Sequence, residues 1–332
     1  MKNINKKKFS WSKINVFKKN SVTPSLVIVY AVMITFFSLI NPLYVSIGNI
    51  KSIFANLTIA GIIAIGFSVV MLAGNFDLSV GSTLGVAAVV CAKLYNIEGV
   101  NIPLPVVILA GLMVGVAIGA LNGFLVTVVG INSVITTLGT LAIFRGLAYL
   151  YATESARIYN KTFIFIGRGY VFKYIPLTFI YMIVMLVGMY LILRFTKFGR
   201  NVYSVGANAY AARLAGISIR KTQFFTFVIC GATAAIGGML MASQLAFGQG
   251  VFGIGYEFKV LTICVLGGIS LAGGRGTLVG VFVAILILGS ISNGLALINV
   301  PINWREAFQG IILIAAILVD SIRVRRRELL KA

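Results

Sequence analysis

The sequence has no histidine and little acid, with seven Asp and Glu against 28 Lys and Arg in 332 residues. The absence of histidine excludes a histidine-based catalytic triad, an imidazole proton relay and the histidine-containing zinc sites. The three cysteines stand alone, without the spacing of a metal site or a redox pair, and are expected to be small apolar residues within helices. The sequence therefore gives no signal for a catalytic centre, a metal or a cofactor.

Apolar residues dominate the composition instead. They make up 59% of the chain, whereas 11% of the residues are charged. Soluble globular domains carry about 25% charged residues. Several apolar runs approach the ~20 residues that cross a hydrocarbon core of ~30 Å as a helix. The sequence therefore predicts an all-α polytopic protein embedded in a lipid bilayer.

Hydropathy, with Gly, Pro, Asn and charged residues as boundaries, predicts about ten transmembrane helices, of which the third and the eighth are short. The expected segments are 25–41, 53–73, 80–95, 104–127, 133–151, 174–193, 223–245, 258–271, 277–298 and 307–321. They form one transmembrane domain, 25–321, between a basic N-terminal tail, 1–24, and a basic C-terminal tail, 322–332.

The basic residues are divided unequally between the two sides of this topology. Nineteen of the 28 lie on the side of the two tails, six of them in the loop 194–222, whereas eight lie on the other side and Arg145 lies within the fifth segment. The positive-inside rule therefore predicts that both termini and this loop are cytoplasmic. The net charge of +21 follows from this topology and does not indicate a nucleic-acid partner.

An internal repeat is indicated by a displacement of 171 residues, which aligns 122–143 with 293–314 without gaps and with seven of 22 positions identical. Asn122 and Asn293 are one of the identical pairs. In the expected topology the two copies lie at opposite faces of the membrane. The repeat therefore predicts an inverted relationship between two halves; chance similarity within the narrow residue alphabet of membrane helices is the alternative.

Glycine recurs at every fourth position of the fourth segment, at Gly111, Gly115, Gly119 and Gly123. On a helix these residues form one groove that allows a neighbouring backbone to approach closely. Packing within the subunit is the favoured interpretation, and a dimer interface is the alternative.

Polar residues interrupt the apolar pattern between the second and third segments, at Asn75, Asp77 and Ser79. An Asp or Ser at this place can accept hydrogen bonds from the free N–H groups that begin the third helix. Alternatively, these residues and Asn293 belong to a path or its gate, because a broken helix persists at membrane depth only where protein or water satisfies its backbone.

Two further segments combine glycine with polar residues. The segment 267–276 is expected to be a turn at the inner face, since the phosphate-binding pattern GxxxxGK[ST] occurs nowhere in the chain. Tyr256, Glu257 and Lys259 are expected at the outer boundary, where an aromatic residue and a Glu–Lys pair are ordinary and are also suitable for docking a partner.

The inner loop 194–222 contains a segment, 208–215, that is typical of a short helix. Asn208 is its expected N-cap and Gly216 its C-terminal stop. A helix of this length is not stable alone in water. It therefore needs a surface to lie against, on this chain or on a partner.

Four motifs occur in a fixed order: Asp77 to Gly81, the inner loop, the triplet Gly255–Tyr256–Glu257, and the turn from Leu266 to Gly274. Together they resemble, over residues 50–320, the ribose-type permeases of bacterial ABC importers, a family with permeases for ribose, xylose and autoinducer-2. The resemblance implies a multi-pass subunit of the bacterial plasma (inner) membrane that imports a sugar or a sugar-like solute.

The resemblance also implies partners. A second permease copy or a paralogue would complete the path as a dimer, a separate ABC ATPase subunit would dock on the cytoplasmic face, and an extracytoplasmic solute-binding protein would deliver the solute. The short inner-loop helix is similar to the coupling helix that contacts the ATPase. The coupling residues carried over are Gly206, Asn208, Ala211, Arg213, Leu214, Gly216 and Ile217. Many relatives have glutamate after the asparagine, where this chain has Ala209.

The residues themselves agree with a transport subunit that is not an enzyme. The chain lacks a nucleotide-binding motif, and it lacks the series of buried carboxylates expected of a proton-coupled carrier. Two alternatives remain. An ion-coupled secondary transporter of a small polar solute would work as this polypeptide alone, and a membrane-embedded enzyme would need a clustered nucleophile, base or metal set.

Overall fold

A computed structural model describes residues 23–97, 100–152 and 155–329, with side chains as far as Ile322. The expected basic tail, 1–24, lies outside this part of the chain except for its last two residues. Ten helices correspond one to one to the ten expected segments. They are α1 Thr23–Ile40, α2 Ile47–Leu72, α3 Val80–Leu94, α4 Leu104–Phe124, α5 Ser133–Tyr151, α7 Leu177–Phe195, α10 Ile219–Leu245, α11 Tyr256–Leu266, α12 Leu278–Leu297 and α13 Ile302–Leu329.

Short elements form the connections between these helices. They are the helices α6 Lys161–Arg168, α8 Lys197–Ala207 and α9 Ala209–Leu214, the 3-10 helix η2 Pro42–Val45, the π-helix η3 Leu125–Val129, and the strands β1 Ala156–Arg157, β2 Tyr170–Val171, β3 Ile175–Pro176 and β4 Phe247–Gly248. The strands form two antiparallel pairs, β1 with β4 and β2 with β3.

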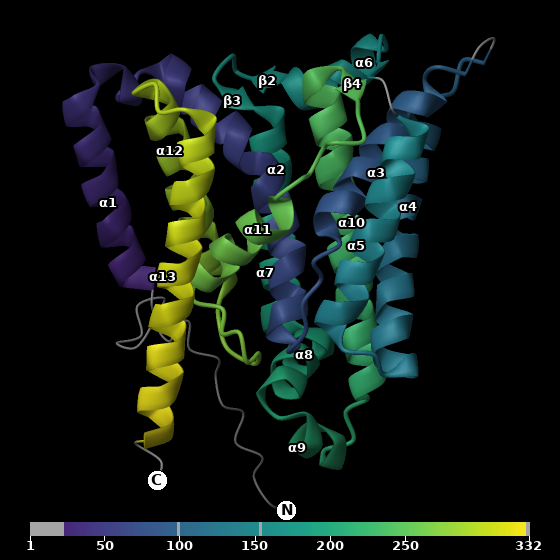
Figure 1. Ribbon diagram of the computed structural model, residues 1–332, viewed down its shortest axis with the longest axis vertical. Helices are drawn as coiled ribbons and strands as arrows, with labels where there is room; N and C mark the ends of the chain where they lie inside the picture. Colours follow the sequence, from purple (N-terminus) through teal and green to yellow (C-terminus); the bar gives the residue numbers. More distant parts are fainter. Residues whose placement is uncertain (1–22, 98–99, 153–154, 330–332) are drawn as a thin grey trace, which may run out of the picture.

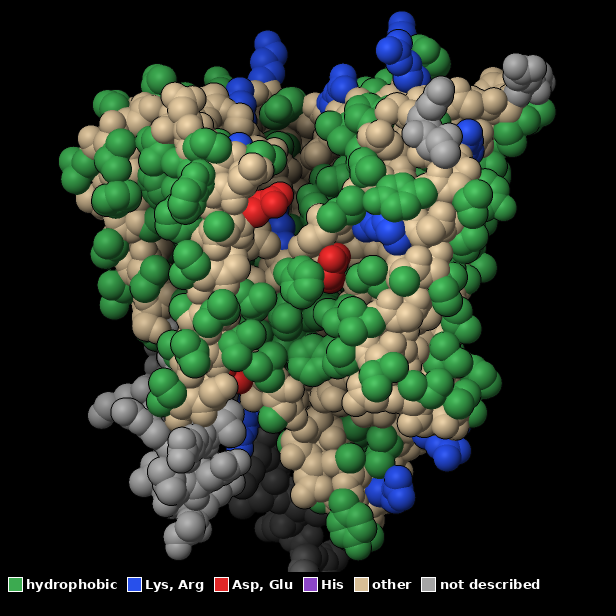
Figure 2. Space-filling view, viewed as in Figure 1, with side chains coloured by type: hydrophobic (Ala, Val, Ile, Leu, Met, Phe, Trp, Pro, Cys, Tyr) green, Lys and Arg blue, Asp and Glu red, His purple; other side chains and the backbone are tan. Residues whose placement is uncertain are grey.

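Seven helices of the described chain are long and apolar enough to cross a membrane. They are α1, α2, α4 with η3, α5, α7, α10 and α12. The third and eighth expected segments form the shorter helices α3 and α11, with 15 and 11 residues. On the face that Figure 2 shows, hydrophobic side chains are spread over the middle of the molecule, and most Lys and Arg side chains lie toward its two ends. The structure confirms an all-α polytopic membrane protein.

The two ends of the bundle carry different elements (Figure 1). One end, which we call the α6 end, holds α6 and the four strands. The other, which we call the α9 end, holds α8, α9 and the last turns of α13. The helix α13 continues to Leu329, through most of the expected tail 322–332.

The displacement of 171 residues relates whole helices. It moves 47–72, 80–94, 104–124 and 133–151 onto segments that overlap α10, α11, α12 and α13 in turn. The contacts between helices repeat in the same way. The contact of α4 with α10 is equivalent to that of α12 with α2, and the contact of α5 with α3 is equivalent to that of α13 with α11. The second set runs in the opposite direction, as α4 and α12 show most clearly (Figure 1). These relationships are those of an inverted repeat.

The helices α2 and α10 are the most buried of the long helices, whereas α1 and α7 are mostly exposed. The glycine groove of α4 faces α10, as expected for packing within the subunit. A Cβ at Gly115 would collide with the carbonyl oxygen of Gly231, and one at Gly119 would collide with that of Phe227. Gly111 faces Met239 of α10, and Gly123 faces Phe224 of α10. The groove therefore brings the two backbones into close contact.

Candidate functional site

The short helix of the inner loop forms as the sequence predicts. The helix α9 spans Ala209–Leu214, and the side chain of Asn208 caps it by accepting a hydrogen bond from the Ala211 amide over 2.9 Å. The helix ends before Gly216, whose φ of +76° lies in the left-handed region that favours glycine. Both predicted ends of this helix are confirmed.

One face of α9 is apolar and uncovered. The side chains of Tyr210 and Leu214 are 72% and 74% exposed, and they lie four residues apart on the same side of the helix. Ala212 on the other side is buried against the chain. Leu214 was among the predicted coupling residues and Tyr210 was not, although its spacing from Leu214 could have indicated it.

A second helix in this loop, α8, was not expected. Its buried residues, Gly199, Val202 and Val205, recur every third position, and Thr196 caps its first turn through the Gly199 amide over 3.2 Å. The helix packs on α2, α7 and α10. It therefore joins α9 rigidly to the centre of the bundle.

The end of α8 meets two other backbones without room for a side chain. A Cβ at Gly206 would collide with the carbonyl oxygen of Leu72 and would lie 2.6 Å from the amide of Gly274. That same amide donates a hydrogen bond to the Leu72 carbonyl over 2.9 Å. Three segments therefore converge here: the end of α8, the end of α2 and the glycine-rich turn that follows α11.

The neighbouring glycines complete this contact. Gly74 and Gly273 have φ values of +83° and +82°, and a Cβ at Gly273 would lie 2.7 Å from the Cα of Gly74. A Cβ at Gly274 would collide with the amide of Ala207. We call Gly74, Gly206, Gly273 and Gly274 the glycine junction. The segment 267–276 is a turn, as predicted, and it is also one side of this junction.

Two side chains hold the turn in place. The Tyr203 hydroxyl of α8 donates to the Gly276 carbonyl over 3.1 Å, and burial raises the pKa of this tyrosine, so it stays a donor at neutral pH. The Asp320 carboxylate of α13 accepts from the Leu271 amide over 3.3 Å. The turn is therefore fixed to α8 and α13 as well as to α2.

Asp77 belongs to a buried polar cluster with Ser79 and Asn122. Its Oδ1 accepts from the Ser79 amide over 3.1 Å, from the Ser79 hydroxyl over 2.6 Å and from Asn122 Nδ2 over 3.3 Å. Asn122 Nδ2 also donates to Ser79 Oγ over 2.8 Å. Ser79 occupies the N-cap position, but its side chain does not bond the amides of α3. The cluster therefore fixes the break between α2 and α3 to α4.

The four residues expected for a path or gate are not brought together. Asp77 and Ser79 are buried, Asn75 is buried nearby with its Nδ2 unpaired, and Asn293 belongs to another part of the molecule. Asn293 Oδ1 accepts from Asn49 Nδ2 over 2.9 Å. Asn122, the repeat partner of Asn293, is the residue that the sequence did not select for this group.

The short helices α3 and α11 begin at one point inside the bundle and run to opposite ends (Figure 1). A Cβ at Gly81 of α3 would collide with the Gly253 carbonyl and with Glu257 Oε2 of α11, so the two helix starts are in contact. Arg145 of α5 holds the segment before α11 by donating to the carbonyls of Gly250 and Phe252 over 2.7 and 2.6 Å. Glu257 therefore lies between helix starts, and not at the outer boundary where it was expected.

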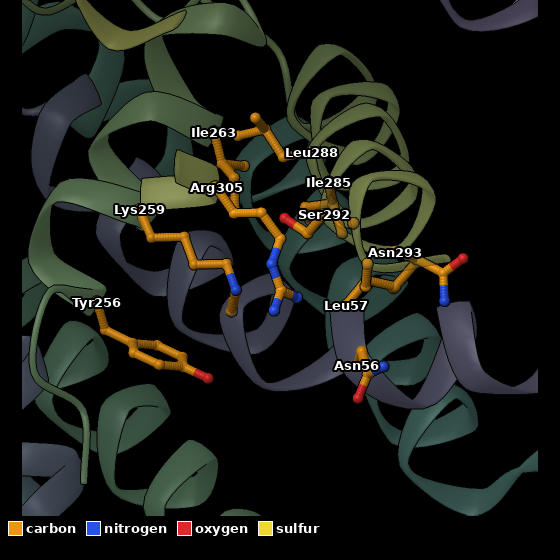
Figure 3. A pocket seen from close by; sticks show the side chains of 13 residues that line it. Asn56, Leu57, Tyr256, Lys259, Ile263, Ile285, Leu288, Ser292, Asn293 and Arg305 are labelled. Carbon is orange, nitrogen blue, oxygen red and sulfur yellow. The ribbon is translucent and has the colours of Figure 1, made fainter. Parts of the chain in front are cut away.

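Tyr256 and Lys259 line a pocket of about 270 Å³ between α2, α11, α12 and the start of α13. Figure 3 shows the ends of Lys259 and Arg305 directed to the same side of this pocket, between Tyr256 and Asn56. Asn293 also lines it. Two of the three residues expected for docking at the outer boundary, Tyr256 and Lys259, therefore lie in the wall of a cavity.

Metal-ligand clusters are absent from the described residues, which contain no group of three or more His, Cys, Asp or Glu. Cys91, Cys230 and Cys264 are free and buried, as expected for small apolar residues of helices.

Comparisons with known proteins agree with this architecture. Residues 49–317 match the family described as branched-chain amino acid transport system / permease component. The chain is 35% identical to the L-arabinose transport system permease protein AraH of Escherichia coli (strain K12), over 91% of this chain and 92% of that protein. It is 36% identical to the autoinducer 2 import system permease protein LsrC of Enterobacter sp. (strain 638), over 85% and 81% of the two chains.

A third relative is the ribose import permease protein RbsC of Bacillus subtilis (strain 168), with 34% identity over 87% of this chain and 89% of that protein. No solved structure matches the chain significantly. The family match covers most of the transmembrane helices, and the relatives align over nearly their full lengths. The chain therefore belongs to this family of membrane permease components of transport systems.

Proposed function

We propose that this chain is the membrane-spanning permease subunit of an ABC importer for a sugar or a sugar-like solute, driven by a separate ATPase. The names of its relatives, which include permeases for arabinose and ribose, support the solute class. The observation that carries the coupling is the uncovered apolar face of α9, which follows directly on the end of α8 at the glycine junction.

The face of α9 suits a protein partner. Tyr210 and Leu214 are exposed residues of α9, the helix at the tip of the α9 end (Figure 1). Moving aromatic and apolar side chains from water into a partner's cleft lowers the free energy, and Arg213 beside them supplies a charged hydrogen-bond donor. Ala209 takes the place where many relatives have a carboxylate, so a matched ATPase is expected.

The glycine junction supports transmission from α9 into the bundle. Gly206 lies two residues before the Asn208 cap, and it touches the break after α2 and the turn after α11 through backbone atoms. Close backbone contacts transmit a displacement with little slack, because packed interiors are not compressible. A movement of α9 therefore reaches both short helices, α3 and α11, at once.

The proposal places the α9 end in the cytoplasm and the α6 end outside, where a solute-binding protein would dock. Basic residues of α8, α9 and the start of α10 then face inward, as the positive-inside rule expects. A second permease copy or a paralogue completes the path. The largely exposed faces of α5 and α13, which are equivalent in the repeat, are available for it.

Reconstitution into proteoliposomes tests the function. The chain is assembled with and without its ATPase and its binding protein, and uptake of radiolabelled ribose and arabinose is measured with ATP or with a Na⁺ or H⁺ gradient. Uptake is expected only with ATP and the complete set of subunits. Uptake by the chain alone on an ion gradient would establish the secondary transporter instead.

Cysteine labelling tests the orientation. The native cysteines are buried, so single Arg213→Cys and Tyr159→Cys variants are the reactive sites of the described chain. In intact cells, a membrane-impermeant maleimide is expected to label Tyr159→Cys at the α6 end and to leave Arg213→Cys unlabelled until the cells are opened. The reverse pattern would invert the topology.

A further inference from the structure

The pocket between α2, α11, α12 and α13 is basic. Lys259 and Arg305 reach into it from two different helices, and no Asp or Glu stands among its lining residues in the described chain. The remaining polar groups are the amides of Asn56 and Asn293 and the hydroxyls of Tyr256 and Ser292. All of these groups, cations and neutral donors alike, can donate hydrogen bonds to oxygen.

The two cations are not neutralised by the pocket. Arg305 Nε is buried and has no hydrogen-bond partner, which is costly for a group that carries part of a positive charge. Lys259 Nζ lies 5.2 Å from the centre of the Tyr256 ring, a cation–π contact that leaves its positive charge without an anionic partner. Glu257, the acidic neighbour on α11, lies against Gly81 and not in this pocket.

We propose that this pocket binds a phosphate group. A guanidinium offers paired donors that match phosphate oxygens, and an ammonium adds a compact charge. The surrounding low dielectric strengthens both interactions. The bound group would neutralise Lys259 and Arg305 together and supply the acceptor that Arg305 Nε lacks.

The size of the pocket restricts the ligand. Its volume of about 270 Å³ lies just below the roughly 300–1,000 Å³ of pockets for drug-sized molecules. A phosphate with a short polyol fits this description, with the hydroxyls directed to Asn56, Asn293 and Ser292. Two sources share this chemistry: the headgroup of an anionic glycerophospholipid and a small soluble phosphate. This inference does not depend on the proposed import function.

Two binding measurements on the purified full-length chain separate the sources. In the lipid arm, the chain is reconstituted in nanodiscs of phosphatidylglycerol or phosphatidylcholine, and retained lipid is identified by native mass spectrometry after extraction. In the soluble arm, the delipidated chain is titrated with inorganic phosphate, glycerol 3-phosphate and ribose. Binding of phosphatidylglycerol or of a soluble phosphate, with ribose bound weakly or not at all, supports the proposal.

Variants tie the binding to the pocket. The double variant Lys259→Gln/Arg305→Gln is expected to weaken phosphate binding at least tenfold, and Lys259→Arg/Arg305→Lys is expected to restore most of it. The control Lys161→Gln/Lys173→Gln removes the same charge from exposed positions at the α6 end. The proposal is overturned if neither phosphate source binds, if ribose binds in place of phosphate, or if the pocket and control variants lose binding equally.

Discussion

The amide of Gly274 donates a hydrogen bond to the carbonyl oxygen of Leu72 over 2.9 Å. This bond joins the end of α2 to the turn after α11, although the two residues are about two hundred positions apart in sequence. It lies directly beside Gly206, at the end of α8. The break that leads to α3, the turn that follows α11 and the connection to α9 therefore share one contact.

Substitution of Gly206 by alanine is expected to uncouple the transporter. The added Cβ would collide with the Leu72 carbonyl, so the three backbones must separate. We expect ATP-driven uptake in proteoliposomes to fall at least tenfold while the chain still inserts and purifies as a monodisperse complex. Gly48→Ala is the control, because nothing lies near a Cβ at that position of α2. Normal uptake by Gly206→Ala would show that the junction is not required.

The cluster around Asp77 is expected to respond to hydrogen-bonding capacity more than to charge. Asp77→Asn keeps an acceptor oxygen for Ser79, whereas Asp77→Leu leaves the amide and the hydroxyl of Ser79 without their acceptor. Each unsatisfied buried donor costs about 1–3 kcal/mol. The free energy of unfolding, measured by denaturant titration in detergent, should therefore fall several kcal/mol more for Asp77→Leu. Equal losses would contradict this role.

The glycine groove on α4 is expected to be intolerant of one methyl group. A Cβ at Gly115 would collide with the Gly231 carbonyl of α10, and overpacking of this kind costs about 1–3 kcal/mol. Gly188→Ala on α7 is the matched control, since open space surrounds that glycine. Thermal unfolding should show a lower midpoint for Gly115→Ala alone. A stable Gly115→Ala variant would mean that α4 and α10 are less closely packed.

The exposed face of α9 is expected to hold the ATPase. Removing Tyr210 and Leu214 together, as Tyr210→Ser/Leu214→Ser, takes away most of the apolar surface of this helix. Co-purification with the ATPase should fall at least tenfold, because buried apolar anchors dominate such interfaces. Tyr159→Ser, which removes an equally exposed tyrosine at the α6 end, should leave it unchanged. Retention of the ATPase by the double variant would place the contact elsewhere.

The sequence predicted the spans well because hydropathy and helix caps are local signals. The ten segments, the short third and eighth helices and the caps of α9 at Asn208 and Gly216 all follow from residues close in the chain. The helix α8 was missed because its apolar spacing is brief and lies within a polar loop. The start of α13 was expected at 307, since Arg305 and Glu306 interrupt the hydropathy, but the helix begins at Ile302.

The positions of the polar residues could not be predicted in the same way. Glu257 was expected at the outer boundary with Tyr256 and Lys259, because an aromatic residue and a Glu–Lys pair are ordinary there. It lies instead against Gly81, a contact between residues far apart in sequence that depends on α3 and α11 beginning at one point. The pairing of Asp77 with Asn122, and of Asn49 with Asn293, depends in the same way on tertiary packing. Hydropathy likewise gives no information on how the four residues of the glycine junction come together.

Two access states follow from the inverted arrangement of α2–α5 and α10–α13. The two halves of an inverted repeat are related by a two-fold axis in the membrane plane. If each half adopts the conformation of the other, the whole molecule has the same shape rotated about that axis, and access changes from one side of the membrane to the other. The energies of the two states then differ only where the halves differ in sequence, for example at Glu257, whose counterpart is Val86. The helices α8 and α9 precede only the second half, so a force applied to α9 by the proposed ATPase would enter the molecule from one side.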